Sequence, residues 1–258
     1  PIYPDLYRQY EDERTRPAAE LLARVPLADA AYVIDLGCGP GNSTELLARR
    51  YPQAQVLGVD NSEALLTQAR ERLPSARFEW GDIAQWQAPL WQGRQPDLIY
   101  ANAALQWVPG HETLLPRLLD MLAPGGVLAV QMPDNREEST HRLMREVAGE
   151  QPWAAAIGDP HKMRTDLLKI GGYYDLLATR ARVDVWHTIY QHPMADGKAI
   201  VEWVRGTGLR PFLQPLSAEL ADSFVVEYTH RVDAAYPVRA DGQRLLAFPR
   251  MFIVAQRP

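Results

Sequence analysis

Short apolar runs alternate with segments of helical periodicity through the first half of the chain. The apolar runs predict strands at 32–36, 56–60, 77–80, 97–101 and 126–131. Helical spacing of apolar residues predicts helices at 15–25, 42–50, 62–73 and 111–122, with Pro17 near the start of the first. Strands separated by helices predict a parallel sheet with right-handed crossovers, and apolar strands predict helices on both of its faces.

The second half of the chain departs from this regular alternation. Helices are predicted at 137–149, 166–180, 196–205 and 217–236, and a strand at 183–190. A last strand is predicted at 245–254, interrupted or bulged at Pro249. We therefore expect one α/β domain over 1–258, with a doubly wound, mostly parallel seven-stranded sheet. A helical cap is expected in two insertions at about 137–180 and 195–240.

A glycine-rich turn between the first predicted strand and the next helix is the strongest local signal. Gly37, Gly39 and Gly41 give the spacing G-x-G-x-G, and Asn42 stands where a dinucleotide fingerprint G-x-G-x-x-G needs its third glycine. Asp35 precedes the turn, where its charge would repel a pyrophosphate and attract an ammonium or sulfonium group. The turn therefore favours a positively charged nucleoside such as S-adenosylmethionine over a dinucleotide.

Polar residues also follow three further predicted strands, at the sheet edge where such folds bind ligands. Asp60 is predicted to accept hydrogen bonds from ribose hydroxyls, Asp82 to accept from an adenine amino group, and Ile83 to pack on the adenine ring. Taken singly, each acid is as well explained as a helix cap or a loop residue. The predicted cofactor-binding residues are Asp35, Gly37, Gly39, Asn42, Asp60, Asn61, Asp82, Ile83, Asn102 and Ala103.

This set resembles the class I S-adenosylmethionine-dependent methyltransferases, whose glycine motif, ribose acid and adenine-side acid match 35–41, Asp60 and Asp82. The family's Leu-x-Pro-Gly-Gly turn matches 122–126. A narrower resemblance, to methyltransferases that esterify one carboxylate of trans-aconitate, runs over nearly the whole chain. The segments that carry it include 102–107, 131–135, 140–146, 207–211 and 246–250, whereas 159–163 and the stretch before Tyr173 depart from the pattern. The resemblance implies S-adenosylmethionine as methyl donor, S-adenosylhomocysteine as product, and trans-aconitate or a related small tricarboxylate as acceptor.

A carboxylate acceptor is already ionised at neutral pH, so this reaction needs no general base. The chain must instead orient a polyanion, for which arginine is the natural partner. Trp107 and His141 are the candidate catalytic residues. The candidate substrate-binding residues are Arg14, Arg210, Arg250, Tyr173 and Tyr174, with Arg16 and Arg145 as weaker arginine candidates on helices.

The amino-acid composition indicates which binding partners and which cellular compartment to expect. A net charge of −5 argues against nucleic acid, and no apolar run is long enough for a membrane span. The single cysteine, Cys38, fits the reducing cytoplasm, and the six histidines show no metal-binding spacing. The alternatives are a methyltransferase for another carboxylate, such as an acyl thioester or a fatty acid, a nicotinamide-dependent oxidoreductase, and a non-catalytic cofactor-binding protein. The sequence leaves the oligomeric state open.

Overall fold

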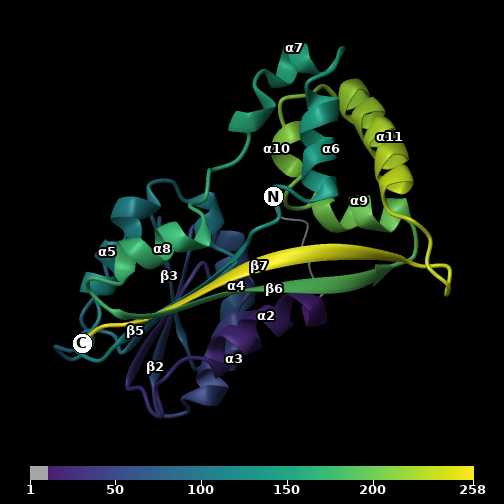
Figure 1. The fold of residues 1–258 in the computed structure, drawn as a ribbon. Helices are drawn as coiled ribbons and strands as arrows, with labels where there is room; N and C mark the ends of the chain where they lie inside the picture. The colour runs from purple at the N-terminus through teal and green to yellow at the C-terminus, as the bar shows by residue number, and fades with distance from the viewer. Residues whose placement is uncertain (1–10) are drawn as a thin grey trace. The chain divides into compact units, whose positions relative to one another are not determined.

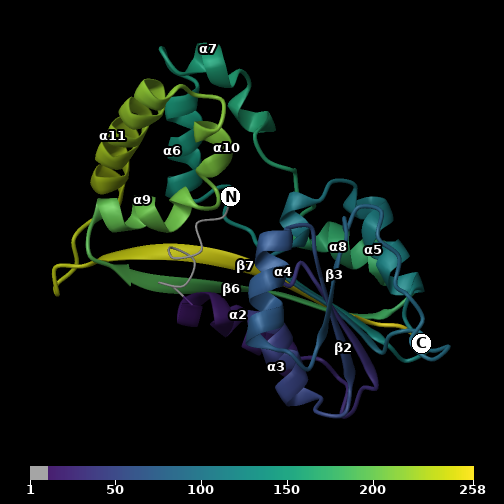
Figure 2. The ribbon, with the colours of Figure 1, turned by 180° about the vertical axis from the view of Figure 1, so that it is seen from behind.

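The computed structural model describes residues 11–258, with side chains from residue 15 onward. Its residues form two compact units (Figures 1 and 2). The first, called the sheet unit here, contains Asp12–Pro133, Asp166–Thr188 and Met251–Pro258. The second, called the helical unit, contains Asp134–Thr165 and Ile189–Arg250.

The sheet unit contains the regular strand and helix alternation expected from the sequence. Its elements are α2 (Glu11–Ala23), β1 (Tyr32–Leu36), α3 (Asn42–Arg50), β2 (Gln55–Asp60), α4 (Glu63–Arg72), β3 (Arg77–Trp80), β4 (Leu98–Asn102), η1 (Leu105–Trp107), α5 (His111–Asp120), β5 (Val127–Pro133) and α8 (Ile170–Leu177). The helical unit contains α6 (Ser139–Ala148), α7 (Ala154–Ile157), η2 (Pro160–Lys162), α9 (Gly197–Arg205), α10 (Arg210–Leu213) and α11 (Ala218–Ala235). Two long strands, β6 (Arg182–Met194) and β7 (Arg244–Gln256), each contribute residues to both units.

The seven strands form one sheet in the order β3-β2-β1-β4-β5-β7-β6, which confirms the predicted fold class. β1 pairs in parallel with β2 and β4, β2 with β3, and β4 with β5. β6 and β7 run in opposite directions as an antiparallel pair (Figure 1). The chain order reverses between β1 and β4, and ligands of such sheets bind beyond the carboxyl ends of the strands at that point.

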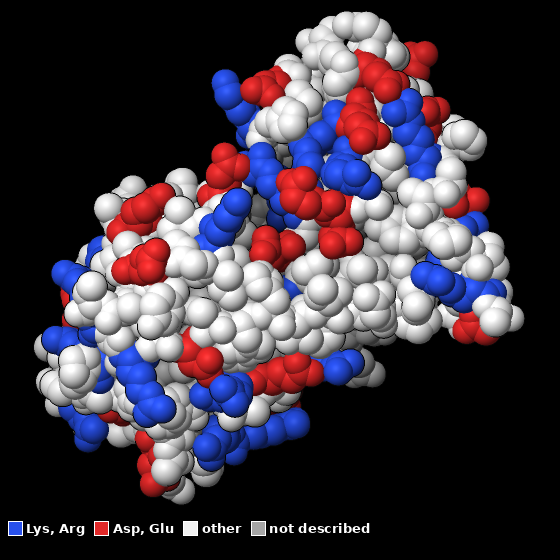
Figure 3. Space-filling view, viewed as in Figure 1, with Lys and Arg blue, Asp and Glu red and all other residues white. Residues whose placement is uncertain are grey.

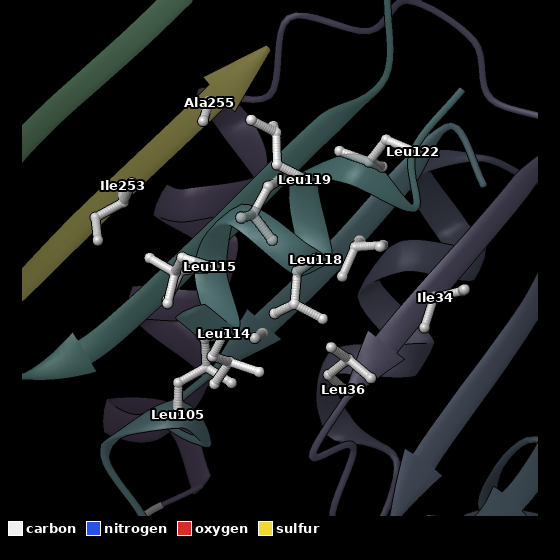
Figure 4. Packing of buried hydrophobic residues seen from close by; sticks show 14 of the residues in the cluster. Ile34, Leu36, Leu105, Leu114, Leu115, Leu118, Leu119, Leu122, Ile253 and Ala255 are labelled. Atoms are coloured by element: carbon white, nitrogen blue, oxygen red, sulfur yellow. The ribbon is translucent and has the colours of Figure 1, made fainter. Parts of the chain in front are cut away.

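The core of the sheet unit explains why α5 forms where it does. Leu114, Leu115, Leu118 and Leu122 recur at helical spacing and are buried (Figure 4). They belong to the same apolar cluster as residues of β1 and β7, such as Ile34 and Ile253, which Figure 4 shows around the helix. Burying each of these leucines contributes roughly 1.5–3 kcal/mol, so this packing fixes the sheet and the loops at its edge.

Two predicted strands differ in extent from the observed ones. β6 continues to Met194 because Tyr190 and Met194 alternate with exposed residues, and Pro193 is tolerated because β6 is an edge strand. The predicted interruption of β7 at Pro249 is wrong, since the strand is continuous from Arg244 to Gln256. The Pro249 carbonyl accepts from the N–H of Asp134, the residue that follows β5. Because the pairing between β5 and β7 ends at this point, the backbone N–H that proline lacks is not needed for it.

Two helices also differ from expectation. α2 begins before residue 15, so that Pro17 lies inside the helix. The helix predicted at 166–180 is shorter, Ile170–Leu177, and this α8 belongs to the sheet unit instead of the cap. Its buried Tyr173 and Leu177 join the core that α5 forms, which explains the assignment. Within residues 11–258, no helix is long and apolar enough to cross a membrane.

Candidate functional site

The glycine turn between β1 and α3 is tightly packed at its first glycine and open at its second. The N–H groups of Gly37 and Cys38 donate to the carbonyl of Val59 at 2.7 and 3.0 Å, which fixes the turn against β2. Gly37 has a φ of +71°, and a Cβ there would lie 2.3 Å from the Cβ of Ala104. Gly39 has a φ of +53°, and a Cβ there would have no atom of the described residues within 4 Å, so the turn faces open space in the part of the chain that the structure describes.

Asp60, at the carboxyl end of β2, joins this turn to the next strand. Its Oδ2 accepts from the N–H of Gly39 at 2.9 Å, and its Oδ1 accepts from the N–H of Ser62 at 2.9 Å. Partial burial raises the pKa of Asp60, while the backbone donors oppose that rise. Each carboxylate oxygen has a second lone pair, so Asp60 can accept further hydrogen bonds from ligand hydroxyls beside the open turn.

Asp35 has a different environment from the one expected. It is fully buried, and its Oδ2 accepts from the hydroxyls of Ser43 and Thr44, both at 2.7 Å. Burial raises its pKa to about 6, with the two hydroxyls and Asp60 as smaller influences. The side chain therefore anchors the start of α3, whose N-cap residue is Gly41. Because the Asp35 carboxyl is buried and already accepts from two hydroxyls, we expect it to attract a cationic ligand less than a free, fully ionised carboxylate would.

The raised pKa of Asp35 predicts how stability depends on pH. The protonated form is favoured in the folded state, so the contribution of this carboxyl is full below 3.8 and is lost as the pH rises to about 6. We expect this loss to be roughly 3 kcal/mol, and Asp35→Asn to remove it. Urea unfolding at pH 4.5 and 7.5 measures about 2 kcal/mol of this loss, because the carboxyl of the unfolded chain is already mostly ionised at pH 4.5. An identical pH dependence in the wild type and Asp35→Asn would contradict the assignment.

The ends of β3 and β4 supply the remaining predicted cofactor residues. Asp82 is exposed and its Oδ1 accepts from the N–H of Ala84 at 3.0 Å, while Ile83 is half-buried beside the position of a Cβ on Gly37. Asn61 is exposed, and its carbonyl accepts from the Trp80 indole at 3.0 Å. The structure thus places all of these residues at the carboxyl edge of the parallel strands.

The segment after β4 is held in an unusual conformation. Ala103 has a φ of +53°, which is strained for a residue with a Cβ, and its N–H donates to the carbonyl of Gln131 at 2.9 Å. Gln106 is buried and donates to the carbonyl of Ala103 at 2.7 Å. The Oδ1 of Asn102 is buried without a hydrogen-bond partner among the described residues. Such a polar atom needs a partner that the described residues do not supply, such as a water molecule or a ligand.

The sequence did not identify His111 as a residue that supports this segment. Its Nε2 contacts the carbonyl of Leu105 in η1 at 2.8 Å, and its Nδ1 contacts the hydroxyl of Tyr173 at 2.6 Å. Because a carbonyl only accepts, Nε2 donates to Leu105, and in the tautomer that carries its proton on Nε2 the Nδ1 atom accepts from Tyr173. His111 therefore links η1 to α8. Only the tertiary structure reveals this link, since 62 residues separate the two partners.

The predicted substrate-binding role of Tyr173 stays a prediction, and the buried contact with His111 favours a structural role for this residue. Its side chain is fully buried, so we expect Tyr173→Phe to lower the free energy of unfolding by about 1–2 kcal/mol through the donor lost to His111. Substrate KM is expected to stay unchanged. Chemical denaturation and steady-state kinetics measure the two effects, and a large rise in KM without destabilisation would favour the original prediction.

The other predicted site residues are distributed over both units. Trp107 in η1 and Tyr174 in α8 are 48% and 44% exposed in the sheet unit. Arg210 opens α10 in the helical unit, and Arg250 is buried there with its guanidinium 4.8 Å from the ring centroid of Phe248. The side chain of Arg14 lies outside the described residues.

His141 on α6 is also in the helical unit, where neighbouring residues enclose it, and its catalytic role stays a prediction. It is buried, with Nδ1 3.1 Å from the hydroxyl of Thr140. A Cβ added to Gly208 would lie 2.6 Å from its Nε2. Burial, assisted by Arg164 and Arg145, places its pKa well below the usual value. His141 is therefore a neutral, enclosed ring at neutral pH.

Known proteins are similar to this chain in sequence and in fold. A family model described as a methyltransferase domain matches residues 33–126. The trans-aconitate 2-methyltransferase of Variovorax paradoxus is 73% identical, over 98% of this chain and 97% of its own. That of Paracidovorax citrulli is 67% identical over the same shares. The YcgJ protein of Bacillus subtilis shares the fold with a TM-score of 0.59, at 14% identity over 94% of this chain and 98% of its own.

The strand order, the open glycine turn and the polar strand ends define a class I methyltransferase. Within that class, the identity to relatives along nearly the whole length is decisive. The chain belongs to the trans-aconitate 2-methyltransferase family.

Proposed function

We propose that this protein transfers a methyl group from S-adenosylmethionine to one carboxylate of trans-aconitate, giving a monomethyl ester and S-adenosylhomocysteine. The observation that carries the proposal is the open turn at Gly39, closed on one side by the Asp60 carboxylate. The substrate follows from the relatives, which carry this name at up to 73% identity.

The residues at this edge fit the methyl donor. Asp60 would accept from the ribose hydroxyls, and the backbone at Gly39 leaves space for the nucleoside. The partnerless Oδ1 of Asn102 suits an ammonium donor, while Asp82 and Ile83 would contact the adenine. When bound, S-adenosylmethionine supplies an electrophilic methyl group on a positively charged sulfur.

The chain's own part in the reaction is positioning and exclusion of water. The acceptor carboxylate is ionised at neutral pH and attacks without losing a proton, so no side chain needs to act as a base. The exposed indole of Trp107, three residues beyond Ala104, is proposed to line the path of the acceptor. Partial dehydration of the carboxylate beside such an apolar ring would raise its reactivity.

The carboxylates that do not react require cations. Arg210 and Arg250 of the helical unit remain proposed substrate contacts, together with Arg14 and the exposed Tyr174. Arginine suits this role because its planar guanidinium pairs with a carboxylate through two parallel hydrogen bonds.

A product assay tests the function. The purified protein with S-adenosylmethionine is offered trans-aconitate, cis-aconitate, citrate and isocitrate separately, and products are analysed by mass spectrometry. We expect a monomethyl ester, formed fastest from trans-aconitate. Binding of S-adenosylhomocysteine without esterification of any acid would overturn the assigned acceptor. Preferential binding of a nicotinamide dinucleotide would overturn the class of reaction.

We also infer that the protein works in the cytoplasm on a small-molecule partner. The only cysteine, Cys38, is buried and cannot form an intramolecular disulfide, as is usual in a reducing compartment. The net charge of −5 is opposite to that expected of a nucleic-acid-binding protein.

A further inference from the structure

The turn that follows β3 carries both predicted adenine contacts, Asp82 and Ile83. The N–H groups of Gln85 and Trp86 donate to the carbonyl of Asp82 at 3.0 and 2.7 Å. The Oδ1 of Asp82 accepts from the N–H of Ala84 at 3.0 Å. These bonds hold the turn through its N–H groups, so the carbonyls that follow Asp82 need donors from another part of the fold.

Arg117 on α5 supplies these donors. Its Nη1 donates to the carbonyl of Trp86 at 2.7 Å, and its Nη2 donates to the carbonyls of Ile83 and Ala84, both at 2.9 Å. The side chain is half-buried and lies 31 to 34 residues away from these partners in the sequence. Hydrogen bonds from a charged donor are stronger than those between neutral groups, so one guanidinium fixes the backbone of the whole turn.

The contacts of Arg117 differ from those of a surface arginine. Figure 3 shows Lys and Arg interspersed with Asp and Glu over the visible face of the sheet unit. Arg180, for example, contacts both carboxylate oxygens of Asp120 at 3.3 and 3.1 Å, and such an exposed pair contributes little to stability. The hydrogen bonds that the Arg117 side chain makes to described residues are all to backbone carbonyls, which indicates a role in holding the backbone.

Ile83 connects this turn to the glycine turn. Its Cδ1 lies 3.7 Å from the position that a Cβ on Gly37 would take, and its side chain packs on the core that α5 forms. A shift of the turn would therefore move Ile83 and Asp82 relative to the glycine turn, beside which the nucleoside is proposed to lie. Groups that bind a ligand must be held within about 0.5 Å of their productive positions, so a small shift is enough to weaken binding.

We propose that Arg117 is a positioning residue for the adenine ring of S-adenosylmethionine. It holds the turn after β3 so that Asp82 faces the adenine amino group and Ile83 faces the ring, and it acts through them without touching the cofactor. This inference rests on the proposed function, which places the adenine beside these two residues. The proposed ribose contact, Asp60, is held by backbone donors of other loops, so the effect of Arg117 should be confined to the purine.

Two ligands that differ only at the purine test this role. S-inosylhomocysteine carries a carbonyl oxygen where S-adenosylhomocysteine carries the amino group that Asp82 is proposed to bind. We expect the wild type to prefer S-adenosylhomocysteine by about tenfold or more, because a carboxylate accepts from an amino group and repels a carbonyl oxygen. Arg117→Gln should weaken S-adenosylhomocysteine about tenfold and S-inosylhomocysteine less than about threefold, as measured by isothermal titration calorimetry.

Two further variants complete the test. Arg117→Lys keeps the charge but lacks the planar fork that spans three carbonyls, so it should retain an intermediate preference for adenine. If Arg117→Gln does not fold by circular dichroism, Arg117→Lys decides alone. Arg180→Gln is the matched control, because Arg180 is an exposed arginine of the same unit, and it should leave both affinities unchanged.

The inference is overturned if the Arg117 variants match the control. It is also overturned if they weaken both ligands equally while lowering thermal stability, since that pattern indicates a purely structural role. A loss of adenine preference supports the inference even if the wild type esterifies none of the acids tested. Equal binding of both ligands by the wild type overturns it even if trans-aconitate is esterified, because Asp82 would then not recognise the amino group.

Discussion

Asp60→Ala is expected to weaken the binding of S-adenosylhomocysteine by about 100-fold or more. The substitution removes the proposed acceptor of two ribose hydroxyls, and each hydrogen bond to a charged group contributes about 1.5–3 kcal/mol. It also removes the carboxylate that accepts from the N–H groups of Gly39 and Ser62, so the open turn loses its support. Isothermal titration calorimetry measures the affinity directly.

Asp29→Ala provides the matched control for Asp60, because Asp29 is an exposed acid of the same unit. Its affinity for S-adenosylhomocysteine should equal that of the wild type. Asp60→Asn retains one acceptor oxygen and should show an intermediate affinity. If Asp60→Ala remained folded by circular dichroism and bound the ligand within about threefold of the wild type, the ribose assignment would be refuted.

Gly37→Ala is expected to lower the free energy of unfolding by about 2–5 kcal/mol. About 1–2 kcal/mol comes from the left-handed backbone at a φ of +71°, which a Cβ disfavours. A further 1–3 kcal/mol, roughly, comes from overpacking, because the new Cβ would lie 2.3 Å from that of Ala104 and 3.5 Å from its Cα. Urea unfolding monitored by tryptophan fluorescence measures the total.

Two further variants separate these causes. Gly125 has a similar φ of +77°, and no atom of the residues that the structure describes lies within 4 Å of a Cβ position there, so Gly125→Ala should show the backbone cost alone. Adding Ala104→Gly to Gly37→Ala removes the overlapping methyl group and should recover most of the packing cost. Equal destabilisation in Gly37→Ala and Gly125→Ala would show that close packing between the turn and the segment after β4 is unimportant.

The glycine turn combines two different properties in one loop. Gly37 is closed against Ala104, whereas Gly39 is open beside Asp60. Stability should therefore respond mainly to changes at Gly37, and ligand affinity mainly to changes at Asp60. A class I methyltransferase site needs both properties, since a nucleoside can lie close to a backbone only if that backbone is held in place.

Interactions within the helical unit were the hardest to predict. The sequence marked Arg145 as one arginine among several and did not single out Arg136 or Arg164. They come together because α6 and the segment after η2 both contact the loop at 135–137. Likewise, no sequence pattern indicated that Gly208 packs against the ring of His141.

By itself, the sequence determined the order of the strands and helices, the glycine turn and the acids at the strand ends. These features depend on local periodicity, on backbone freedom at glycine and on the direction of parallel strands, all of which are encoded within short segments. Only the tertiary structure decided that Asp35 anchors α3, that Tyr173 is a core residue bound to His111, and that three arginines share one loop. Burial and hydrogen bonding between residues far apart in the chain determine such roles, and no local pattern encodes them.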